Sequence, residues 1–380
     1  MPLSFTEILT WLREQDSQRL DQLWQAADGL RKRHAGDEVH LRGLIEISNF
    51  CTSRCAYCGL RVSNTALTRY RLDEDEIMAC VRQAVDFGYG TVVLQAGEDP
   101  GLTREWIAGL VRRIKTETPL AVTLSLGERP ERELLAWRTA GADRYLLRFE
   151  TSNRPLYDRI HPSPPSRVSD RLGLLPRLRE MGYEIGSGVM IGIPGQSYKD
   201  LARDIQWFGE LDLDMIGVGP FLPHPATPLG DPGWGAAAKD QVPSSEEMTY
   251  KMIALARLAC PRANIPSTTA LATLNRARGR ELGLARGANV VMPNLTPPAY
   301  RALYEIYPDK ACVRETSDAC HACLGMRIAA IDRRVGQGRG DSPNAIHRQT
   351  PTNEDDSRAK YSPRNPLPPD ANATRMSEPV

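Results

Sequence analysis

The chain has 380 residues, of which 41% are hydrophobic and 25% charged, and its formal net charge is +1. This is ordinary globular composition, and the near-neutral charge gives no reason to expect nucleic acid or an acidic membrane surface as a partner. No apolar stretch is long enough to span a bilayer, and the N-terminal residues lack the pattern of a secretory signal. We therefore expect a cytoplasmic protein, in which structural disulfides are uncommon.

Residues 1–38 predict an N-terminal helical extension. Between residues 4 and 36 the apolar side chains recur at helical spacing, and those that set the pattern are Phe5, Ile8, Leu9, Leu12, Leu20, Leu23 and Trp24. This periodicity predicts an amphipathic helix over the span.

Residues 39–335 predict a single α/β barrel domain. Short apolar, β-branched runs alternate there with segments of helical periodicity. Eight such runs occur, at 41–48, 91–97, 120–126, 144–150, 184–192, 215–221, 264–270 and 288–294. In the helical segment 73–88, Asp73 and Glu76 form a candidate capping box and Gly88 a stop signal. Strand–helix alternation implies parallel pairing, and eight units favour a closed (β/α)8 TIM-type barrel over an open doubly wound sheet.

The unusual loops of this barrel all follow predicted strands. They are the cysteine-containing segment after the first strand, "GEDP" (97–100) after the second, Glu150 at the end of the fourth, "GIPGQ" (192–196) after the fifth and "PFLPHPATPLG" (220–230) after the sixth. Barrel enzymes carry their chemistry in the loops at the carboxyl ends of the strands. The sequence therefore places these segments together at one mouth of the barrel.

Residues 336–380 differ in composition from the rest of the chain. They are rich in Pro, Asn, Ser and charged residues and contain few large apolar side chains. Such a segment does not bury enough apolar surface to offset the entropy lost on ordering. We predict a disordered C-terminal tail.

Cys51, Cys55 and Cys58 form a C-x₃-C-x₂-C group directly after the first strand. Three thiolates do not complete a tetrahedral zinc site, and no fourth ligand is near, although a zinc knuckle or redox loop is the alternative. Electron-transfer clusters usually have four protein ligands. A four-iron cluster with three protein thiolates leaves one iron open, and the amino and carboxylate groups of S-adenosylmethionine are suited to chelate it. One electron from such a cluster splits the sulfonium C–S bond and gives a 5′-deoxyadenosyl radical.

This cysteine motif, with the aromatic Tyr57 just before its last cysteine, resembles the signature of the radical S-adenosylmethionine (radical SAM) superfamily. Between about residues 40 and 333 the chain is also similar to one branch of it, the [FeFe]-hydrogenase maturase HydE family. The segments that carry the resemblance include "SNFCTSRCAYCGLR", "VVLQAGEDP", "TLSLGER", "AGADRYLLRFET", "MIGIPGQ", "DMIGVGPFLPHPATPL" and "GANVVMPNLTPPAYRALYEIYP". Each segment is weak alone, and the combination is specific.

The resemblance implies a role for individual residues. It implies that the three loop cysteines bind a [4Fe-4S] cluster and that Glu150 and Arg171 bind S-adenosylmethionine, with Met190 lining the adenine. An acid and an arginine suit the ammonium and carboxylate of that molecule. Surface ion pairs and a core methionine are the structural alternatives. The resemblance further implies that Tyr304 and Tyr307 are catalytic and that Tyr57, Thr123 and Ser125 help to bind the cofactor. It also places Glu128 at the family's barrel cavity.

Cys312, Cys320 and Cys323 form a second group, spaced C-x₇-C-x₂-C. A C-x₂-C pair with a third cysteine is a metal signal by itself. The resemblance implies an optional second iron–sulfur cluster, [2Fe-2S] or [4Fe-4S], which the family does not require for activity. Zinc and unligated thiols remain as alternatives. We expect this site, near the C-terminus, to be more exposed than the first.

The resemblance implies a step in assembly of the diiron unit of the hydrogenase H-cluster. Its implied partners are a small molecule or small iron complex as substrate, a ferredoxin- or flavodoxin-like electron donor and other hydrogenase maturases. Biotin synthase is disfavoured because it needs cysteines inside the barrel, and none lies between Cys80 and Cys260. A mutase of the methylornithine type and a non-catalytic iron–sulfur or zinc protein that docks a partner remain as alternatives.

Overall fold

The computed structural model describes residues 3–163, 168–231, 233–234 and 239–349. Its centre is a parallel sheet with the strand order β6-β5-β4-β3-β2-β1-β7, and β8 pairs with β1. The strands are β1 (Glu38–Ser48), β2 (Thr91–Ala96), β3 (Ala121–Ser125), β4 (Arg144–Leu146), β5 (Glu184–Ile191), β6 (Met215–Pro220), β7 (Val290–Val291) and β8 (Arg334–Val335). The sequential order of β1 to β6 confirms the predicted parallel strand–helix architecture.

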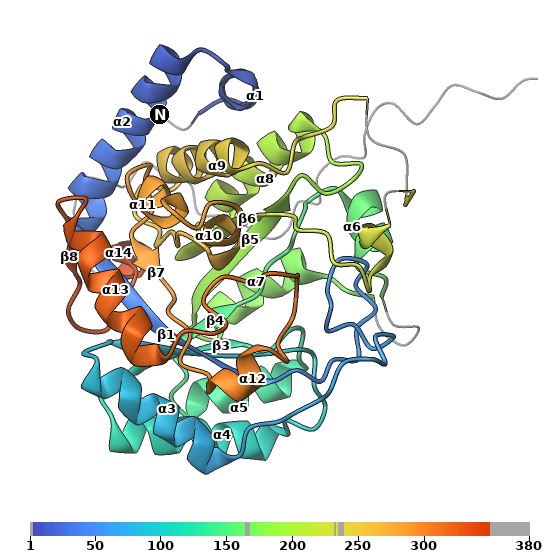
Figure 1. The fold of residues 1–380 in the computed structure, drawn as a ribbon, viewed down its shortest axis with the longest axis vertical. Helices are drawn as coiled ribbons and strands as arrows, with labels where there is room; N and C mark the ends of the chain where they lie inside the picture. The colour runs from blue at the N-terminus through green and yellow to red at the C-terminus, as the bar shows by residue number, and fades with distance from the viewer. Residues whose placement is uncertain (1–2, 164–167, 232, 235–238, 350–380) are drawn as a thin grey trace, which may run out of the picture.

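Helices cover the outside of this sheet (Figure 1). They are α1 (Phe5–Arg13), α2 (Ser17–Ala35), α3 (Glu74–Asp86), α4 (Arg104–Glu117), α5 (Glu131–Thr139), α6 (Arg154–Ile160), α7 (Arg171–Glu180), α8 (Tyr198–Glu210), α9 (Glu246–Ala259), α10 (Thr269–Leu274), α11 (Gly279–Leu284), α12 (Pro298–Arg301), α13 (Ser317–Ala329) and α14 (Pro343–Gln349), with a 3₁₀ turn η1 at Pro228–Gly230. Within the described residues, no helix combines the length and apolar character needed to cross a membrane.

Short elements close the barrel between β6 and β1. Met215 of β6 bridges Asn264, Pro266 bridges Val290 of β7, and β7 pairs in turn with β1. The predicted seventh strand, 264–270, is thus reduced to two isolated bridges, and α10 begins where that prediction ended. Pro266 has no N–H for a continuous ladder, and Thr268 caps α10 by accepting a hydrogen bond from the Leu271 amide.

The N-terminal extension consists of two helices where the periodicity predicted one. The helix α1 ends at Arg13, and Asp16 starts α2 by accepting a hydrogen bond from the Arg19 amide. The buried Lys251 of α9 donates to the carbonyl of Glu14 at 2.6 Å and so stabilises the break. Both helices pack against the barrel, α1 on α8 and α9 and α2 on α9.

The predicted capping box on the first barrel helix is confirmed. In α3 the Asp73 side chain accepts from the Glu76 amide at 2.8 Å, and the Glu76 carboxylate accepts from the Asp73 amide at 2.9 Å. Gly88 follows the helix with a φ of +70°, which is the left-handed conformation that favours glycine.

The segment 336–342 forms a floor under the amino ends of the strands. The carbonyl of Arg339 accepts from Thr91 Oγ1 at 2.7 Å, and the carbonyl of Gly340 accepts from Arg42 Nη2 at 2.9 Å. Arg144 forms an ion pair with Asp341. The helix α14 follows directly.

The prediction of disorder from residue 336 is therefore wrong for 336–349, because hydrogen bonds to backbone carbonyls hold this segment without large apolar side chains. Residues 350–380 of that prediction lie outside the described residues.

A buried carboxylate ties the loop after β4 to the helix α8. Asp204 Oδ1 accepts hydrogen bonds from the backbone amide and the hydroxyl of Ser152, each at 2.6 Å. Its other oxygen has no hydrogen-bond partner in the described structure. Burial raises the pKa of Asp204 to about 7.

We expect Asp204 to make the protein less stable as the pH rises. The folded pKa of about 7 lies above the ordinary value of 3.8, so the stabilisation from protonated Asp204 is complete below pH 3.8 and is lost as the pH rises through about 7. Relative to Asp204→Asn, the wild-type free energy of unfolding should fall by roughly 3–4 kcal/mol between those limits. Denaturant titrations of both proteins at several pH values measure this. Parallel pH profiles would show that Asp204 stays ionised in the fold.

Candidate active site

The cysteine loop, residues 49–70, connects β1 to α3 and is held in place by backbone hydrogen bonds. The Ala56 amide donates to the Ile160 carbonyl at 2.7 Å, and the Gly59 amide donates to the Ile306 carbonyl at 3.1 Å. Further backbone bonds join the loop to Glu98 and Leu229. Segments that follow four different strands thus fix the loop, and its thiols are positioned by the whole mouth of the barrel.

The three thiols of the loop are shielded from water. Cys55 is buried, and Cys51 and Cys58 are half-buried. Burial raises the pKa of Cys51 and raises that of Cys58 to about 12. The thiols therefore hold their protons at neutral pH until a metal displaces them.

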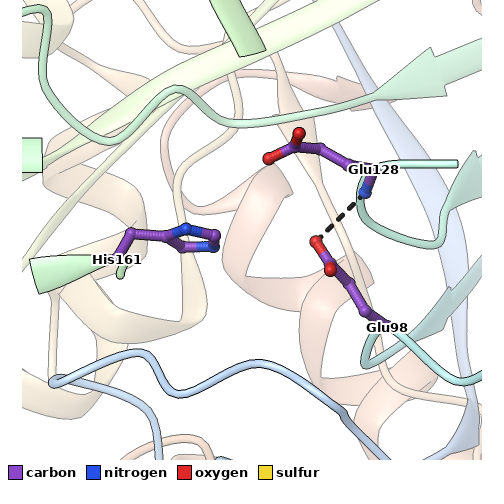
Figure 2. Close-up of side chains that lie close together, drawn as sticks. All are labelled: Glu98, Glu128 and His161. Atoms are coloured by element: carbon purple, nitrogen blue, oxygen red, sulfur yellow. Dashed lines mark hydrogen bonds between the residues drawn. The ribbon is translucent and has the colours of Figure 1, made fainter. Parts of the chain in front are cut away.

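Next to this loop, two carboxylates and an imidazole approach one another (Figure 2). Among the described residues, Glu98, Glu128 and His161 are the one group of three potential ligand side chains with all ligand atoms within 4.8 Å. The Glu128 amide donates to Glu98 Oε1 at 3.1 Å, the dashed line in Figure 2. Glu98 also contacts the cysteine loop, because its amide lies 3.4 Å from Cys51 Sγ and its carboxylate accepts from Ser53 at 3.0 Å.

A guanidinium group lies among these three side chains. Arg171, the first residue of α7, has its Nε 3.1 Å from Glu128 Oε1 and its Nη2 3.5 Å from Glu98 Oε1. The same Nη2 lies 2.6 Å from His161 Nε2, which must accept because a guanidinium only donates. The positive charge of Arg171 occupies the place that a cation would take. The group in Figure 2 is therefore an arginine-holding cluster and not a metal site.

A cavity of about 310 Å³ extends from the cysteine loop into the barrel. Seven of the residues selected from the sequence line it, namely Cys51, Cys55, Ser125, Glu150, Arg171, Tyr307 and Cys312. Glu150 has a left-handed backbone with a φ of 62°, which costs a non-glycine residue of the order of 1 kcal/mol or more. Its Oε2 lies 3.1 Å from Arg148 Nη2 but accepts no hydrogen bond. Glu150 therefore offers an available acceptor to a ligand.

Other predicted residues lie around the cavity without lining it. Met190 belongs to a small apolar cluster with Ala56 of the cysteine loop, and Tyr57 of the same loop packs against this cluster. Thr123 is fully buried within β3. The Tyr304 hydroxyl accepts from Gln95 at 3.2 Å, and Gln95 lines the cavity. Glu128 lines an outer cleft beside the mouth instead.

Sequence reasoning missed several charged residues of the cavity. Lys310 and Glu46 form a buried ion pair at 2.8 Å, with side chains only 6% and 2% exposed, and both line the cavity. Burial raises the pKa of Glu46. No local pattern marks this pair, because 264 positions separate its members. For Glu98 a signal existed, because "GEDP" follows the second strand at the mouth, whereas nothing in the sequence singled out His161.

The C-terminal cysteines are less exposed than expected. Cys312 lines the cavity, Cys320 is 6% exposed, and Cys323 alone is exposed. A hydrogen bond from Cys320, together with the Arg280 side chain 3.5 Å away, lowers the pKa of the Cys312 thiol. The expectation of an exposed site is therefore wrong for two of the three cysteines, because the segment after α12 packs back against the barrel.

Comparison with known proteins agrees with this fold. The family model of the radical SAM superfamily matches residues 45–208. The [FeFe] hydrogenase maturase subunit HydE of Thermotoga maritima is 46% identical over 318 residues, covering 84% of this chain and 88% of that protein. The 3-methylornithine synthase of Methanosarcina acetivorans is 28% identical over 76% of this chain and 79% of its own. The crystal structure of methylornithine synthase superposes with a TM-score of 0.74 at 24% identity, covering 89% and 95% of the two chains, which shows the shared fold.

The fold and the cysteine loop define a radical SAM enzyme, which uses a [4Fe-4S] cluster, S-adenosylmethionine, a reductant and a small-molecule substrate. Within that superfamily the chain belongs to the family of the [FeFe] hydrogenase maturase subunit HydE.

The residues at the mouth fit these groups. Cys51, Cys55 and Cys58 come from one loop at the mouth, and Cys51 and Cys55 line the cavity. Gly97 leaves room for the loop, because a Cβ there would lie 2.7 Å from the Cβ of Cys51. The unsatisfied Glu150 oxygen faces the same cavity and suits an ammonium or hydroxyl group.

Proposed function

We propose that this radical SAM enzyme acts in the maturation of an [FeFe]-hydrogenase, on a small iron complex or other small molecule bound in the barrel cavity. The observation that carries the proposal is the 46% identity over 88% of the Thermotoga maritima maturase. The C-terminal cysteine group supports it, because the resemblance to the maturase family includes that group and the methylornithine branch normally lacks it.

In this proposal Cys51, Cys55 and Cys58 hold the [4Fe-4S] cluster and leave one iron for S-adenosylmethionine. The bound cluster supplies the electron that splits the sulfonium C–S bond, and the chain itself binds, orients and shields. The position of Cys55, buried and lining the cavity, supports formation of the radical away from water.

Charged residues beside the loop suit the amino-acid end of S-adenosylmethionine. We assign its carboxylate to Arg171 and its ammonium to Glu98 and Glu150. Glu98 and Arg171 line the cavity within a few ångströms of each other, and Glu98 contacts Cys51 directly. A carboxylate side chain next to an arginine can pair with both the ammonium and the carboxylate of a zwitterionic amino acid. We assign Tyr57 and Met190 to the adenosine side, because both pack in the apolar cluster at the loop.

Deeper in the cavity, we assign substrate contact to Tyr307 and Ser125, which line it, and an indirect role to Tyr304. The Tyr304 hydroxyl holds the cavity residue Gln95, and Lys310 lies 5.2 Å from the Tyr304 ring centre. Thr123 lies beneath the lining. Its buried hydroxyl has no hydrogen-bond partner in the described structure, which fits a position under the substrate but shows no contact with it.

The test of this function has two parts. Under anaerobic conditions with dithionite, the reconstituted protein should convert S-adenosylmethionine to 5′-deoxyadenosine and methionine. Added to the other maturases and apo-hydrogenase, it should then restore hydrogen production. Cleavage without maturation, combined with rearrangement of a free amino acid, would favour the methylornithine-type mutase that the 28% identical relative exemplifies. The absence of any cleavage would leave a non-catalytic iron–sulfur protein.

We propose a second iron–sulfur cluster at Cys312, Cys320 and Cys323, supported by the contact of the first two thiols. We expect the triple change Cys312→Ala, Cys320→Ala, Cys323→Ala to leave S-adenosylmethionine cleavage and hydrogenase maturation within about a few-fold of wild type, a barrier change under ~1 kcal/mol. The reason is that the loop cysteines hold their cluster without contributions from this site. Iron counts and turnover of both reconstituted proteins measure the effect. An inactive triple variant that keeps its first cluster would give the second site a catalytic or relay role.

A further inference from the structure

The segment that follows β6, "PFLPHPATPLG" (220–230), folds around the backbone of His224. The His224 carbonyl accepts hydrogen bonds from the amide and the hydroxyl of Thr227, at 3.0 Å and 2.8 Å. Gly230 packs against the same carbonyl, because a Cβ there would overlap its oxygen. His224 itself is 5% exposed. The segment is therefore a compact loop with a buried histidine at its centre.

The two ring nitrogens of His224 have different surroundings. Nδ1 accepts a hydrogen bond from the Ala226 amide at 3.1 Å, so the neutral ring carries its proton on Nε2. Nε2 is buried and has no hydrogen-bond partner among the described residues, and the Glu305 carboxylate lies 3.8 Å from it. A buried donor without a partner is costly, so such a group in a native fold calls for a use.

The Nε2 edge of the ring packs against Gly59, the residue that follows Cys58 in the cysteine loop. A Cβ added to Gly59 would lie 2.6 Å from Nε2 and 2.7 Å from Cδ2 of His224, so only glycine lets the ring approach so closely. The carbonyl of Glu305 crowds the same position, and the Gly59 amide donates to the Ile306 carbonyl at 3.1 Å. Gly59 is thus clamped between the segment after β6 and the segment after α12.

The clamp acts on Cys58 through one short turn. The Arg61 amide donates to the Cys58 carbonyl at 3.1 Å, which closes a turn with Gly59 and Leu60 at its centre. Burial raises the pKa of Cys58 to about 12, and a hydrogen bond from the Leu60 amide to its sulfur opposes this effect. The same amide belongs to the peptide bond between Gly59 and Leu60. A ring that fixes Gly59 therefore also fixes a donor that faces the Cys58 sulfur.

We propose that the Nε2 edge of His224 positions Cys58 and the neighbouring amide, and thereby helps to set the reduction potential of the iron–sulfur cluster. Hydrogen bonds to the cysteine sulfurs are one of the features that set this potential. The same segment also holds Ala56, on the other side of Cys58, because the Leu229 amide donates to its carbonyl at 2.9 Å. The inference rests on the proposed assignment of the loop cysteines as cluster ligands.

Two single variants each keep the role of one ring nitrogen. The side-chain oxygen of asparagine lies near the place of Nδ1, so His224→Asn keeps an acceptor for the Ala226 amide and removes the ring edge at Gly59. The side-chain nitrogen of glutamine lies near the place of Nε2, so His224→Gln keeps a donor at Gly59. The variant His224→Ala removes both. The control is His34→Asn, because His34 lies in the last turn of α2, in the N-terminal extension.

Each protein is reconstituted anaerobically with iron and sulfide, and its iron content, thermal unfolding, reduced-cluster EPR spectrum and midpoint potential are measured. The EPR signal that responds to added S-adenosylmethionine identifies the loop cluster. We expect wild-type iron content throughout, because no ligand is changed. In His224→Asn and His224→Ala the EPR spectrum should change and the potential should fall, by about tenfold in the reduction equilibrium or ~59 mV for one electron. His224→Gln should stay within about threefold of wild type, and His34→Asn should match it.

Two results would overturn the role of His224. One is a His224→Ala protein that carries its full iron with the potential and EPR spectrum of wild type. The other is an equal shift in His224→Asn and His224→Gln, which would show that the Nε2 edge has no special part; this comparison also decides the matter if His224→Ala does not fold. Wild type that takes up no cluster responsive to S-adenosylmethionine would instead refute the assignment of the loop cysteines.

Discussion

Replacing Cys55 with alanine is expected to abolish formation of 5′-deoxyadenosine and to lower the iron content by about four atoms per chain. Cys55 is the most buried of the three loop thiols, and it lines the cavity. Two remaining thiolates do not hold a four-iron cluster with one open iron. Cys51→Ala and Cys58→Ala should behave in the same way. Iron analysis, the visible absorption of the cluster and product chromatography after anaerobic reconstitution measure the result.

Cys80→Ala is the matched control for these variants. Cys80 is also a buried cysteine, 4% exposed, but it lies in α3 and packs in the main apolar core. Its loss should cost about 1 kcal/mol of stability and leave iron content and turnover unchanged. A Cys55→Ala protein that still releases 5′-deoxyadenosine, while Cys80→Ala behaves as wild type, would refute the assignment of the loop.

Arg171→Ala is expected to weaken S-adenosylmethionine binding by roughly tenfold to a hundredfold, which corresponds to about 1.5–3 kcal/mol for one charged hydrogen bond. The guanidinium also forms ion pairs with Glu98 and Glu128, which lie 3.5 Å and 3.1 Å away. Removing one partner of a buried pair costs about 3–5 kcal/mol of stability. The dissociation constant should therefore be measured anaerobically, together with iron content and thermal unfolding.

Two variants separate binding from stability at this position. Arg171→Lys keeps a positive charge beside the two carboxylates but lacks the planar fork, so it should fold better than Arg171→Ala and still bind S-adenosylmethionine more weakly than wild type. Arg177→Ala removes an exposed arginine of the same helix and should change neither property. Unaltered affinity in a folded Arg171 variant would show that this residue serves only to balance the charges in Figure 2.

The strands and helices that the sequence predicted correctly are those whose residues repeat a local pattern. The runs that became β1, β2, β3, β5 and β6 are apolar and β-branched, and the capping box of α3 is a pattern over four residues. Errors occurred where distant contacts decide the structure. The segment 264–270 lost its strand because Pro266 and the cap of α10 compete with the ladder. The floor segment looked disordered because its partners, such as Arg42 and Thr91, are remote in sequence.

The residues of the site also differ in whether a local sequence pattern marked them. The cysteine loop was evident because three thiols in eight positions have few structural uses. The cluster around Arg171 was predicted only in part from the sequence. Glu98, Glu128 and His161 come from three different loops and meet only in the folded protein. The ion pair of Lys310 with Glu46 gave no local signal. Charges that are paired across a barrel can be found only when the barrel is known.

The floor beneath the barrel also bears on the order of events during synthesis. The strand β1 is made early, yet it pairs with β7 and β8, and Arg42 bonds the carbonyl of Gly340. A growing chain therefore keeps one edge of β1 unpaired until almost all of the described residues have left the ribosome. The cysteine loop exists throughout that interval, whereas Leu229 and Ile306, which fasten it, come much later. Its thiols are thus translated well before the segments that enclose them in the folded barrel.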